Sequence, residues 1–470
     1  MASSKRIFSK IFAFVSIIIA IIFAIFLNKY NILPQKYRYV LIFAIFLFLI
    51  LYLFLLFRKK RLHIAFNFIF IILLVLLNLG EISAISYGNK SINTLEAINK
   101  KEKETETKMS FVVLKESDLM TTSDIGDEPI AVAEGFDREN NKKALESLDK
   151  DLKLVNKNDY VEAGLSLLNG ESQVMVLNEG FRGMLDEAID GFSEKTRVLD
   201  SVLIKDEKKK REKVEENESF NVYISGIDTY GDLSNVSRSD VNMVLSVNPK
   251  SGKILITSIP RDTYLNIGAM GKDKLTHAGL FGVDTSIESL ENLLDIDIDY
   301  YARVNFTSLM ELVDVLGGIK VENPTAFTSS SGKYTFPQGN VYMDGDMALA
   351  YARERYNLEE GDFDRGKNHA RIMAAIIRKM LSPDMLLNFN SIADIALNSV
   401  NTDMPYEKMI ELVNNQVDKG QDWYIESQSL EGYGQAGLTS LLMPYADLYM
   451  MVPYDESVEQ IGKNIDLNND

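Results

Sequence analysis

The distribution of apolar residues divides the chain into a membrane-like start and a mixed remainder. Three long apolar runs lie within the first 80 residues, separated by polar stretches: Ile11–Leu27, Tyr39–Phe57 and Leu62–Leu79. Each is about long enough to cross the hydrocarbon core of a bilayer as a helix. Because no small-residue cleavage site stands out, the pattern indicates three transmembrane helices rather than a cleaved signal peptide. We therefore expect a membrane domain at residues 1–88.

Basic residues predict how these helices are oriented. Three basic residues precede the first run, and Arg58-Lys-Lys-Arg61 separates the second from the third. Such clusters stay in the cytoplasm. The first loop also carries three basic residues, but at lower density. An odd number of spans then places everything after Glu81 outside a multi-pass membrane protein.

After a polar stretch at Asn89–Lys108, which is typical of a linker, the pattern becomes that of a small α/β accessory domain at residues 105–207. No catalytic motif stands out in it. Its expected strands are Phe111–Leu114, Ile130–Val132 and Gln173–Leu177, its expected helices are Ala144–Leu152, Val161–Leu168 and Phe181–Ile189, and Thr196–Ile204 closes it as a strand or a helix.

Strands and helices alternate again at residues 217–384, which predicts a domain with α-β-α layers around a central mixed sheet. Its expected strands begin with Asn221–Ile224, Val241–Val247 and Lys253–Ile259, followed by Tyr300–Val304 and Ile319–Glu322. Helix patterns lie between and after them, the last at Asn368–Leu381. We expect residues 385–470 to form a mostly helical extension that packs on this domain.

Charge and composition narrow the function. Residues 1–81 hold ten Lys or Arg and one acid, whereas the whole chain has a net charge of −17, so the remainder carries −26. This acidic exterior argues against a nucleic-acid partner. The chain has no cysteine and three histidines. Cysteine nucleophiles and thiolate metal sites are therefore excluded, and a histidine-rich metal site is disfavoured.

Five short motifs at or just beyond apolar segments carry the candidate chemistry. Their arginines suit a phosphate or pyrophosphate, because guanidinium binds phosphate oxygens with two parallel hydrogen bonds. The alternative is a set of surface salt bridges, which is disfavoured because the last 90 residues contain no arginine. The motifs are Ser225-Gly-Ile-Asp228, Arg238-Ser-Asp240, Ile259-Pro-Arg-Asp-Thr263, Tyr351-Ala-Arg-Glu-Arg355 and Asp362-Phe-Asp-Arg365.

The carboxylates in these motifs predict a cation. Asp228 follows one expected strand and Asp240 precedes the next. Two facing carboxylates repel unless a cation lies between them, so we expect Mg²⁺, with Mn²⁺ as a possibility. The alternative for Asp228 is a turn cap. Asp262 is expected to brace an arginine or a backbone amide.

Whether two pairs of residues can face the same ligand depends on where a helix ends or starts. Arg353 and Arg355 share a side only if the chain is extended there, so the preceding helix must end near Ala352 for both to bind one phosphate. Arg365 and His369 are four residues apart and would lie on one face of a helix that starts near Asp364. Alternatively, Asp362 and Asp364 only cap that helix, and His369 is an ordinary surface histidine.

In this order and spacing, the motifs resemble the LytR–CpsA–Psr (LCP) family of Gram-positive cell-envelope enzymes, over roughly Phe220–Leu381. The three spans and the accessory domain resemble the streptococcal CpsA type, whose accessory unit has been likened to a polymerase processivity domain. The resemblance implies an apolar tunnel for a polyprenyl chain. It also implies transfer of a glycopolymer, for this type capsular polysaccharide, from undecaprenyl pyrophosphate to peptidoglycan outside the membrane.

The resemblance also assigns site residues. It implies that Asp228 and Asp240 bind the metal and that Asp362 is a further polar position of the site. Relatives usually carry glutamine where this chain has His369, and either side chain can donate a hydrogen bond to phosphate, although a histidine could make binding pH-dependent. The pyrophosphate would be held by Arg238, Arg261, Arg353, Arg355 and Arg365.

Charge neutralisation at such a site suits phosphoryl transfer without covalent catalysis. Asp228, Asp240, Arg261 and Arg353 are the candidate catalytic residues, and Asp240 or Asp262 could accept the proton of an attacking sugar hydroxyl. Two other functions stay open. One is a polyprenyl-pyrophosphate pyrophosphatase, in which water replaces the sugar hydroxyl. The other is a non-catalytic membrane regulator that senses lipid-linked precursors.

Overall fold

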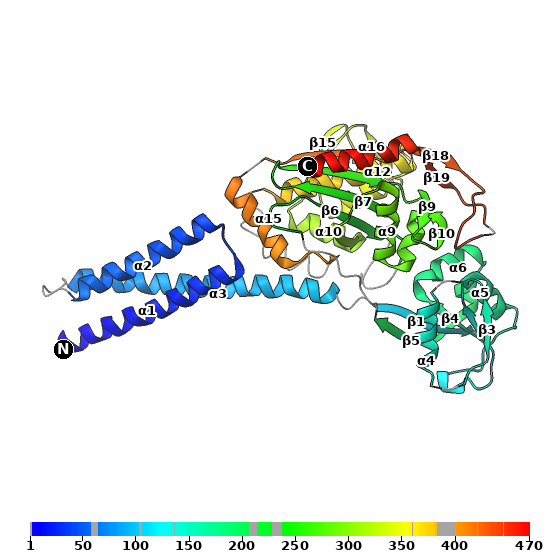
Figure 1. Cartoon of the computed structure of the whole chain (residues 1–470), viewed down its shortest axis with the longest axis horizontal. Coiled ribbons are helices and arrows are strands. Elements are labelled where there is room, and N and C mark those ends of the chain that lie inside the picture. The colour runs from blue at the N-terminus through cyan, green and yellow to red at the C-terminus, as the bar shows by residue number, and fades with distance from the viewer. Residues whose placement is uncertain are drawn as a thin grey trace. The chain divides into compact units, whose positions relative to one another are not determined.

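The computed structural model describes residues 2–57, 64–102, 106–135, 137–149, 151–205, 214–227, 237–359, 361–382, 400–420, 422–444 and 446–470 (Figure 1). Side chains are described in these ranges except at residues 2–7, 64–65, 98–102, 106 and 362. The chain forms two compact units, one that contains the N-terminal helices together with residues 405–420 and one that contains most of the remaining chain. Asp228 and the basic cluster Arg58–Arg61 lie outside the described residues.

The N-terminal unit contains three long helices, α1 (Ala2–Tyr30), α2 (Gln35–Phe57) and α3 (Ile64–Glu102). Each includes a segment that is long and apolar enough to cross a membrane. The expected linker at Asn89–Lys108 is corrected in part, because α3 continues without a break to Glu102. Alanine, glutamate and lysine favour a helix also in a polar segment, so polarity alone does not distinguish a linker from a helix extension.

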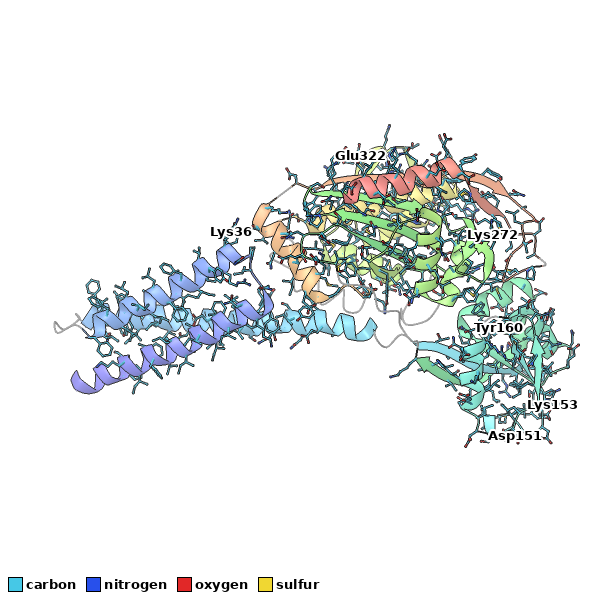
Figure 2. The ribbon with its side chains drawn as sticks, in the orientation of Figure 1. Lys36, Asp151, Lys153, Tyr160, Lys272 and Glu322 are labelled. Carbon is cyan, nitrogen blue, oxygen red and sulfur yellow. The ribbon has the colours of Figure 1, made fainter. Side chains whose placement is uncertain are left out.

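The accessory domain spans β1 to β5 and contains a five-stranded sheet in the order β3-β2-β4-β1-β5. Strands β2, β3 and β4 are parallel, and β1 is antiparallel to both β4 and β5. Tyr160, labelled in Figure 2, is fully buried in this domain. The elements are β1 (Glu106–Leu114), η1 (Thr122–Asp124), β2 (Ile130–Ala133), α4 (Arg138–Glu146), β3 (Leu154–Lys157), α5 (Tyr160–Leu168), β4 (Val174–Asn178), η2 (Glu179–Phe181), α6 (Arg182–Ala188), α7 (Phe192–Lys195) and β5 (Thr196–Lys205).

One accessory helix differs from the prediction. The expected helix Ala144–Leu152 is wrong in position: α4 ends at Glu146, and β3 follows at Leu154. Strand β3 is an edge strand with an exposed–intermediate burial pattern. Its sequence, Leu-Val-Asn-Lys, is too short and too polar to show an alternation of apolar residues.

The main domain, which begins at β6, is built on a six-stranded mixed sheet in the order β16-β11-β6-β7-β8-β17. The four central strands are β6 (Phe220–Ile227), β7 (Val241–Asn248), β8 (Lys253–Ile259) and β11 (Tyr300–Asn305). Strands β6, β7 and β8 are antiparallel neighbours, whereas β11 lies parallel to β6. The predicted mixed central sheet is thus confirmed.

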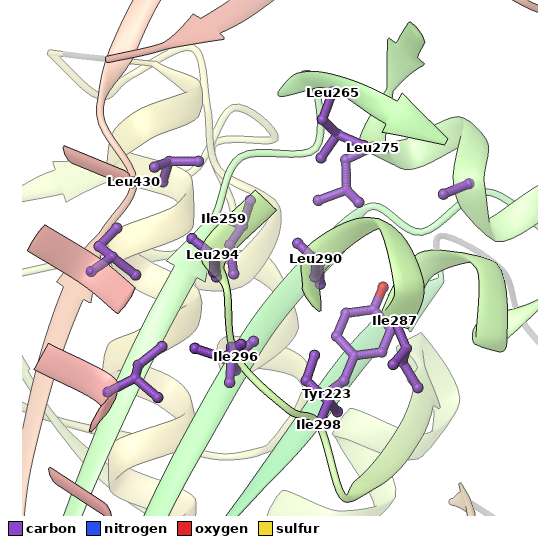
Figure 3. Packing of buried hydrophobic residues seen from close by; sticks show 14 of the residues in the cluster. Tyr223, Ile259, Leu265, Leu275, Ile287, Leu290, Leu294, Ile296, Ile298 and Leu430 are labelled. Atoms are coloured by element: carbon purple, nitrogen blue, oxygen red, sulfur yellow. The ribbon is translucent and has the colours of Figure 1, made fainter. Parts of the chain in front are cut away.

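Alternation along the strands assigns each buried side chain to one of two faces. Tyr223 and its partner Val244 belong to a core cluster that also contains Leu290 of α9 and Ile461 of α16 (Figure 3). Their neighbours in sequence point to the opposite face. Both faces are covered by helices, which is the layered arrangement expected from the sequence. The helices are α8 (Leu275–Ala278), α9 (Val283–Leu294), α10 (Phe306–Val315), α11 (Gly345–Arg353), α12 (Asp362–Met380) and α16 (Asp455–Asn469).

The C-terminal region corrects another expectation. It is not a single, mostly helical extension, because β16 (Asn401–Thr402) and β17 (Tyr424–Ser429) are the two edge strands of the main sheet. Helix α15 (Tyr406–Lys419) instead belongs to the unit of the N-terminal helices. The remaining strands are β9 (Tyr264–Ile267), β10 (Gly271–Lys274), β12 (Ile319–Asn323), β13 (Phe327–Thr328), β14 (Thr335–Phe336), β15 (Gly339–Met343), β18 (Gly432–Gln435) and β19 (Met450–Pro453).

Candidate active site

A cavity of about 190 Å³ lies on the face of the main sheet opposite the core cluster of Tyr223. Ile224 and Met243, which are register partners on β6 and β7, point into it, whereas Tyr223 and Val244 point to the other face. Among the described residues, helix α12 supplies five further lining residues and helix α10 supplies two. The two-residue period of the strands therefore sends one set of side chains to the core and the other to the cavity.

The body of the cavity is apolar. Helix α12 lines it at a spacing of three and four residues, which brings one stripe of the helix to the cavity. This lining suits a hydrocarbon chain, since burial of apolar surface is favourable by about 25 cal/mol per Å². The apolar lining residues with large side chains are Ile224, Ile227, Val241, Met243, Val304, Phe306, Leu309, Ile372, Met373 and Ile376.

Charged residues and one histidine from four separate elements gather at the same cavity. Asp240 precedes β7, Arg261 follows β8, Arg353 ends α11, and Arg365 and His369 lie on the first turns of α12. Three guanidinium groups against one carboxylate give this group a net positive charge. An apolar cavity with cationic groups fits an amphiphilic anion, whose phosphate would meet the arginines and whose hydrocarbon part would lie in the body.

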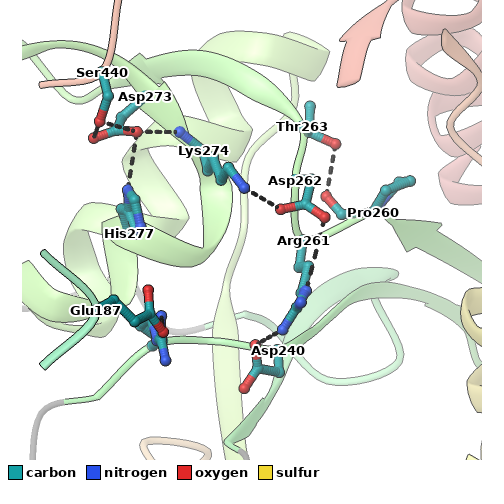
Figure 4. Close-up of polar contacts among 11 residues, drawn as sticks. Glu187, Asp240, Pro260, Arg261, Asp262, Thr263, Asp273, Lys274, His277 and Ser440 are labelled. Atoms are coloured by element: carbon teal, nitrogen blue, oxygen red, sulfur yellow. Dashed lines mark hydrogen bonds and ion pairs between the residues drawn. The ribbon is translucent and has the colours of Figure 1, made fainter. Parts of the chain in front are cut away.

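Asp240 and Arg261 form an ion pair, with 2.7 Å between Asp240 Oδ1 and Arg261 Nη1 (Figure 4). The Arg261 Nε atom lies 3.8 Å from Asp262 Oδ2, and Lys274 Nζ lies 2.8 Å from Asp262 Oδ1. Asp262 therefore contacts Arg261 weakly and Lys274 closely, and it is not among the residues that line the cavity. Lys274 was missed by the sequence analysis, because a single lysine at the end of a short strand carries no distinctive pattern.

The end of α11 separates Arg353 from Arg355. The helix ends at Arg353, and Glu354 is extended with φ −64° and ψ 134°. The Arg353 guanidinium lies over the Phe306 ring, 4.6 Å from its centroid, and lines the cavity. Arg355 instead lies over Tyr356 and is not among the lining residues. The helix thus ends close to the expected position, but only one of the two arginines reaches this cavity.

Buried Glu354 stabilises the turn that separates Arg353 from Arg355. Its carboxylate accepts hydrogen bonds from the Ser330 backbone N–H at 2.5 Å and hydroxyl at 2.6 Å, and from the backbone N–H of Arg355 and Asn357. Burial alone would raise the pKa of this carboxyl, but the hydrogen bonds from Ser330 and the backbone outweigh it and hold the pKa below its usual value. The turn after α11 is therefore fixed by a charge-assisted network.

The first turns of α12 arrange Arg365 and His369 as the four-residue spacing predicts, since both line the cavity. The His369 Nε2 atom lies 2.8 Å from the carbonyl oxygen of Ala352. A carbonyl only accepts, so Nε2 carries the proton. Burial first, and the charge of Arg365 second, lower the pKa of His369 from 6.5 to about 4. The neutral ring therefore has no N–H left to donate to a phosphate.

The remaining predicted site residues do not reach the cavity or are not described. Arg238 contacts Glu187 of the accessory domain, with 2.7 Å between Arg238 Nη1 and Glu187 Oε1, and is not a lining residue. Asp228 lies outside the described residues. Asp362 begins α12, but its side chain is not described. Roles for these residues stay predictions.

Part of the expected magnesium site can be compared with the structure. Within the described residues, no group of three or more His, Asp or Glu side chains is arranged for a metal ion. Asp240 lines the cavity, and its ion pair with Arg261 engages one oxygen, Oδ1. Because Mg²⁺ is commonly held by one or two carboxylates together with substrate phosphates, this donor set fits an ion that binds with the pyrophosphate.

A mixed sheet between helices, with an arginine-bearing apolar cavity, defines an α/β protein suited to a lipid-linked phosphate. The family model described as LytR_cpsA_psr matches residues 191–452, and the chain belongs to this family. A second model, described as a DNA polymerase processivity factor, matches residues 65–177, which include most of the accessory domain.

Relatives agree with this assignment. The chain is 36% identical over 247 residues to the polyisoprenyl-teichoic acid–peptidoglycan teichoic acid transferase TagU of Halalkalibacterium halodurans, covering 52% of this chain and 77% of the relative. It is 33% identical to TagU of Oceanobacillus iheyensis, covering 53% and 76%. The crystal structure of Bacillus subtilis TagU has 28% identity and a TM-score of 0.43, covering 54% of this chain and 97% of that one.

Proposed function

We propose that this protein transfers a glycopolymer from a polyprenyl-pyrophosphate carrier to peptidoglycan. The observation that carries the proposal is the cavity itself, whose lining combines Asp240, three arginines and an apolar body. A polyprenyl pyrophosphate has the same two parts, a polyanion joined to a long hydrocarbon. The transferase names of the relatives at 33–36% identity support the same reaction class.

The main task of these residues is to stabilise the negative charge that develops on the leaving group. The acceptor sugar hydroxyl attacks the phosphorus that carries the glycopolymer, a new phosphorus–oxygen bond forms, and the bond to the bridging oxygen breaks. The polyprenyl phosphate that leaves gains negative charge, which Arg261, Arg353 and Arg365 stabilise. A Mg²⁺ ion held by Asp240, together with Asp228, would add charge neutralisation at the phosphates.

The proton of the attacking hydroxyl needs an acceptor. Of the two acids considered, Asp240 lines the cavity and Asp262 does not. Asp262 is also paired with Lys274 at 2.8 Å. This geometry favours Asp240 as the proton acceptor, in a step in which neither Arg261 nor a metal ion engages the carboxylate oxygen that takes the proton.

The substrate and location are finer parts of the proposal. We take the glycopolymer to be capsular polysaccharide, because the three spans and the accessory domain resemble the CpsA type. The three apolar helices would form a multi-pass anchor, and the accessory and main domains would lie outside the membrane. Both the lipid-linked donor and the peptidoglycan acceptor would then be within reach of the cavity.

Reconstitution tests the proposal against its alternatives. Full-length protein in liposomes is given a labelled glycan on polyprenyl pyrophosphate and Mg²⁺, with and without peptidoglycan. Labelled peptidoglycan supports transfer, whereas release of phosphate without any linkage supports a pyrophosphatase. A D240A variant that still attaches polymer in cells would instead indicate a regulator that needs no catalysis.

A further inference from the structure

The accessory domain contacts one of the arginines that the family motif assigns to pyrophosphate. Arg238 lies two residues before Asp240, which lines the cavity, but Arg238 itself does not. Its Nη1 atom lies 2.7 Å from Oε1 of Glu187 on α6. Glu187 is labelled in Figure 4, together with Asp240 and Arg261. A residue of the accessory domain thus holds a guanidinium group near the candidate active site.

This contact is formed on a packed surface. Met184 and Leu185 of α6 are buried in one apolar cluster together with Leu280, Leu442 and Met443 of the main domain. The rings of Phe181 and Phe281 lie edge to face across the same surface, with 5.6 Å between their centroids. Because Met184 and Leu185 of α6 are buried in this cluster, the backbone that carries Glu187 is held in place.

The main-domain side of this surface is equally well anchored. Fully buried Asp273 accepts hydrogen bonds from the Ser440 hydroxyl (Figure 4) and from the backbone N–H of Leu442. Burial opposes ionisation of Asp273, but its contact with His277 and the hydrogen bonds from the backbone N–H groups of Leu442 and Lys274 outweigh burial and hold its pKa below the usual value. The loop that carries Leu442 into the accessory core is therefore fixed to the β9–β10 hairpin.

The backbone beside Arg238 is fixed as well. Ser239 is buried, its hydroxyl lies 2.8 Å from that of Ser225, and its backbone N–H donates to the Thr276 carbonyl. The side chains of Arg238 and Glu187 are 36% and 51% exposed. An ion pair with this exposure is weak, so it can exchange when a more strongly charged partner arrives. What can move here is the Arg238 side chain, between fixed backbones.

We propose that Glu187 is a positioning residue that holds Arg238 away from the cavity until a pyrophosphate takes over the guanidinium group. The inference rests on the proposed function, because it needs a pyrophosphate at the cavity. The accessory domain thereby takes part in substrate binding, because Glu187 determines how readily Arg238 can bind the pyrophosphate. Since two negative phosphates replace one carboxylate, the exchange favours the bound state.

The test measures binding of geranylgeranyl pyrophosphate to full-length protein in detergent, with Mg²⁺ present. E187Q removes the competing charge and should tighten binding about two- to five-fold, the range expected for an exposed ion pair. E187D keeps the charge and should bind about as the wild type does. E116Q is the matched control, because it removes an exposed charge elsewhere in the same domain and should leave binding unchanged.

A second variant checks the route through Arg238. R238A should weaken binding, and adding E187Q to R238A should then have no further effect. The inference is overturned if E187Q binds as the wild type or more weakly, or if it still tightens binding in the R238A background. If the wild-type protein does not bind geranylgeranyl pyrophosphate at all, the proposed function is overturned as well. This result separates a failure of the proposed function from a failure of the inference about Glu187 alone.

Discussion

The protonation state of His369 is a direct test of the electrostatics at the cavity. Its Nε2–H donates to the Ala352 carbonyl at 2.8 Å, while burial and Arg365 lower the pKa from 6.5 to about 4. The charged residues that line the cavity together with His369 are Asp240, Arg261, Arg353 and Arg365. We therefore expect a neutral ring with an unprotonated Nδ1 throughout the physiological range.

The magnitude follows from linkage. One pKa unit corresponds to about 1.4 kcal/mol, so the fall from 6.5 to about 4 is worth about 3 kcal/mol in favour of the neutral ring. The folded pKa lies below the unfolded one, so the unfolded chain binds more protons between these values. The free energy of unfolding should therefore decrease as pH falls from 6.5 toward 4, and this contribution should be absent in H369Q.

Histidine NMR provides the assay, since the chain has only three histidines. In ¹⁵N-histidine-labelled full-length protein, the resonance that H369Q removes should keep its neutral, Nε2-protonated position from pH 8 down to about 5. Binding of a polyprenyl pyrophosphate should raise this pKa, because the anion stabilises the imidazolium. A titration midpoint near 6.5 in the free protein, or an Nδ1-protonated tautomer, would refute the reasoning.

Three further predictions concern the cavity and the turn beside it. R261A should weaken binding of polyprenyl pyrophosphate by about 1.5–3 kcal/mol, the value of a charge-assisted contact; calorimetry that shows an unchanged Kd would remove Arg261 from the site. M373W should fill the apolar body and weaken binding of geranylgeranyl pyrophosphate at least about tenfold, since more than 1.4 kcal/mol of apolar burial is lost, while inorganic pyrophosphate binds as before; equal loss for both ligands would contradict a hydrocarbon site. E354Q should lower stability in denaturant by about 1–3 kcal/mol because it removes the charge that orders the turn, with E359Q at an exposed position as the control; equal stability of the two variants would contradict that role.

Much of the main sheet was predictable, because buried strands with β-rich sequences recur at regular spacing. The same pattern places Arg261 after β8 and Arg365 and His369 on one face of α12, and the structure brings these residues to one cavity with Asp240 and Arg353. Their roles in catalysis stay predictions. Strand β17 was not recognised, since Tyr-Ile-Glu-Ser-Gln-Ser at a sheet edge is largely polar.

The side-chain positions of two arginines could not be predicted from sequence patterns. The direction of Arg355 depends on Glu354, whose carboxylate is held by Ser330 from a distant loop. The position of Arg238 depends on Glu187, which is 51 residues away in another domain. Both are set by tertiary contacts between short polar segments, and these leave no periodic signal along the chain.

The most direct test of the central claim is a structure of the protein with bound polyprenyl pyrophosphate and Mg²⁺. The account predicts the pyrophosphate beside Arg261, Arg353 and Arg365, and the hydrocarbon chain between the sheet and helices α10 and α12. A ligand bound elsewhere on the molecule, or a cavity that stays without hydrocarbon at saturating ligand, would contradict it.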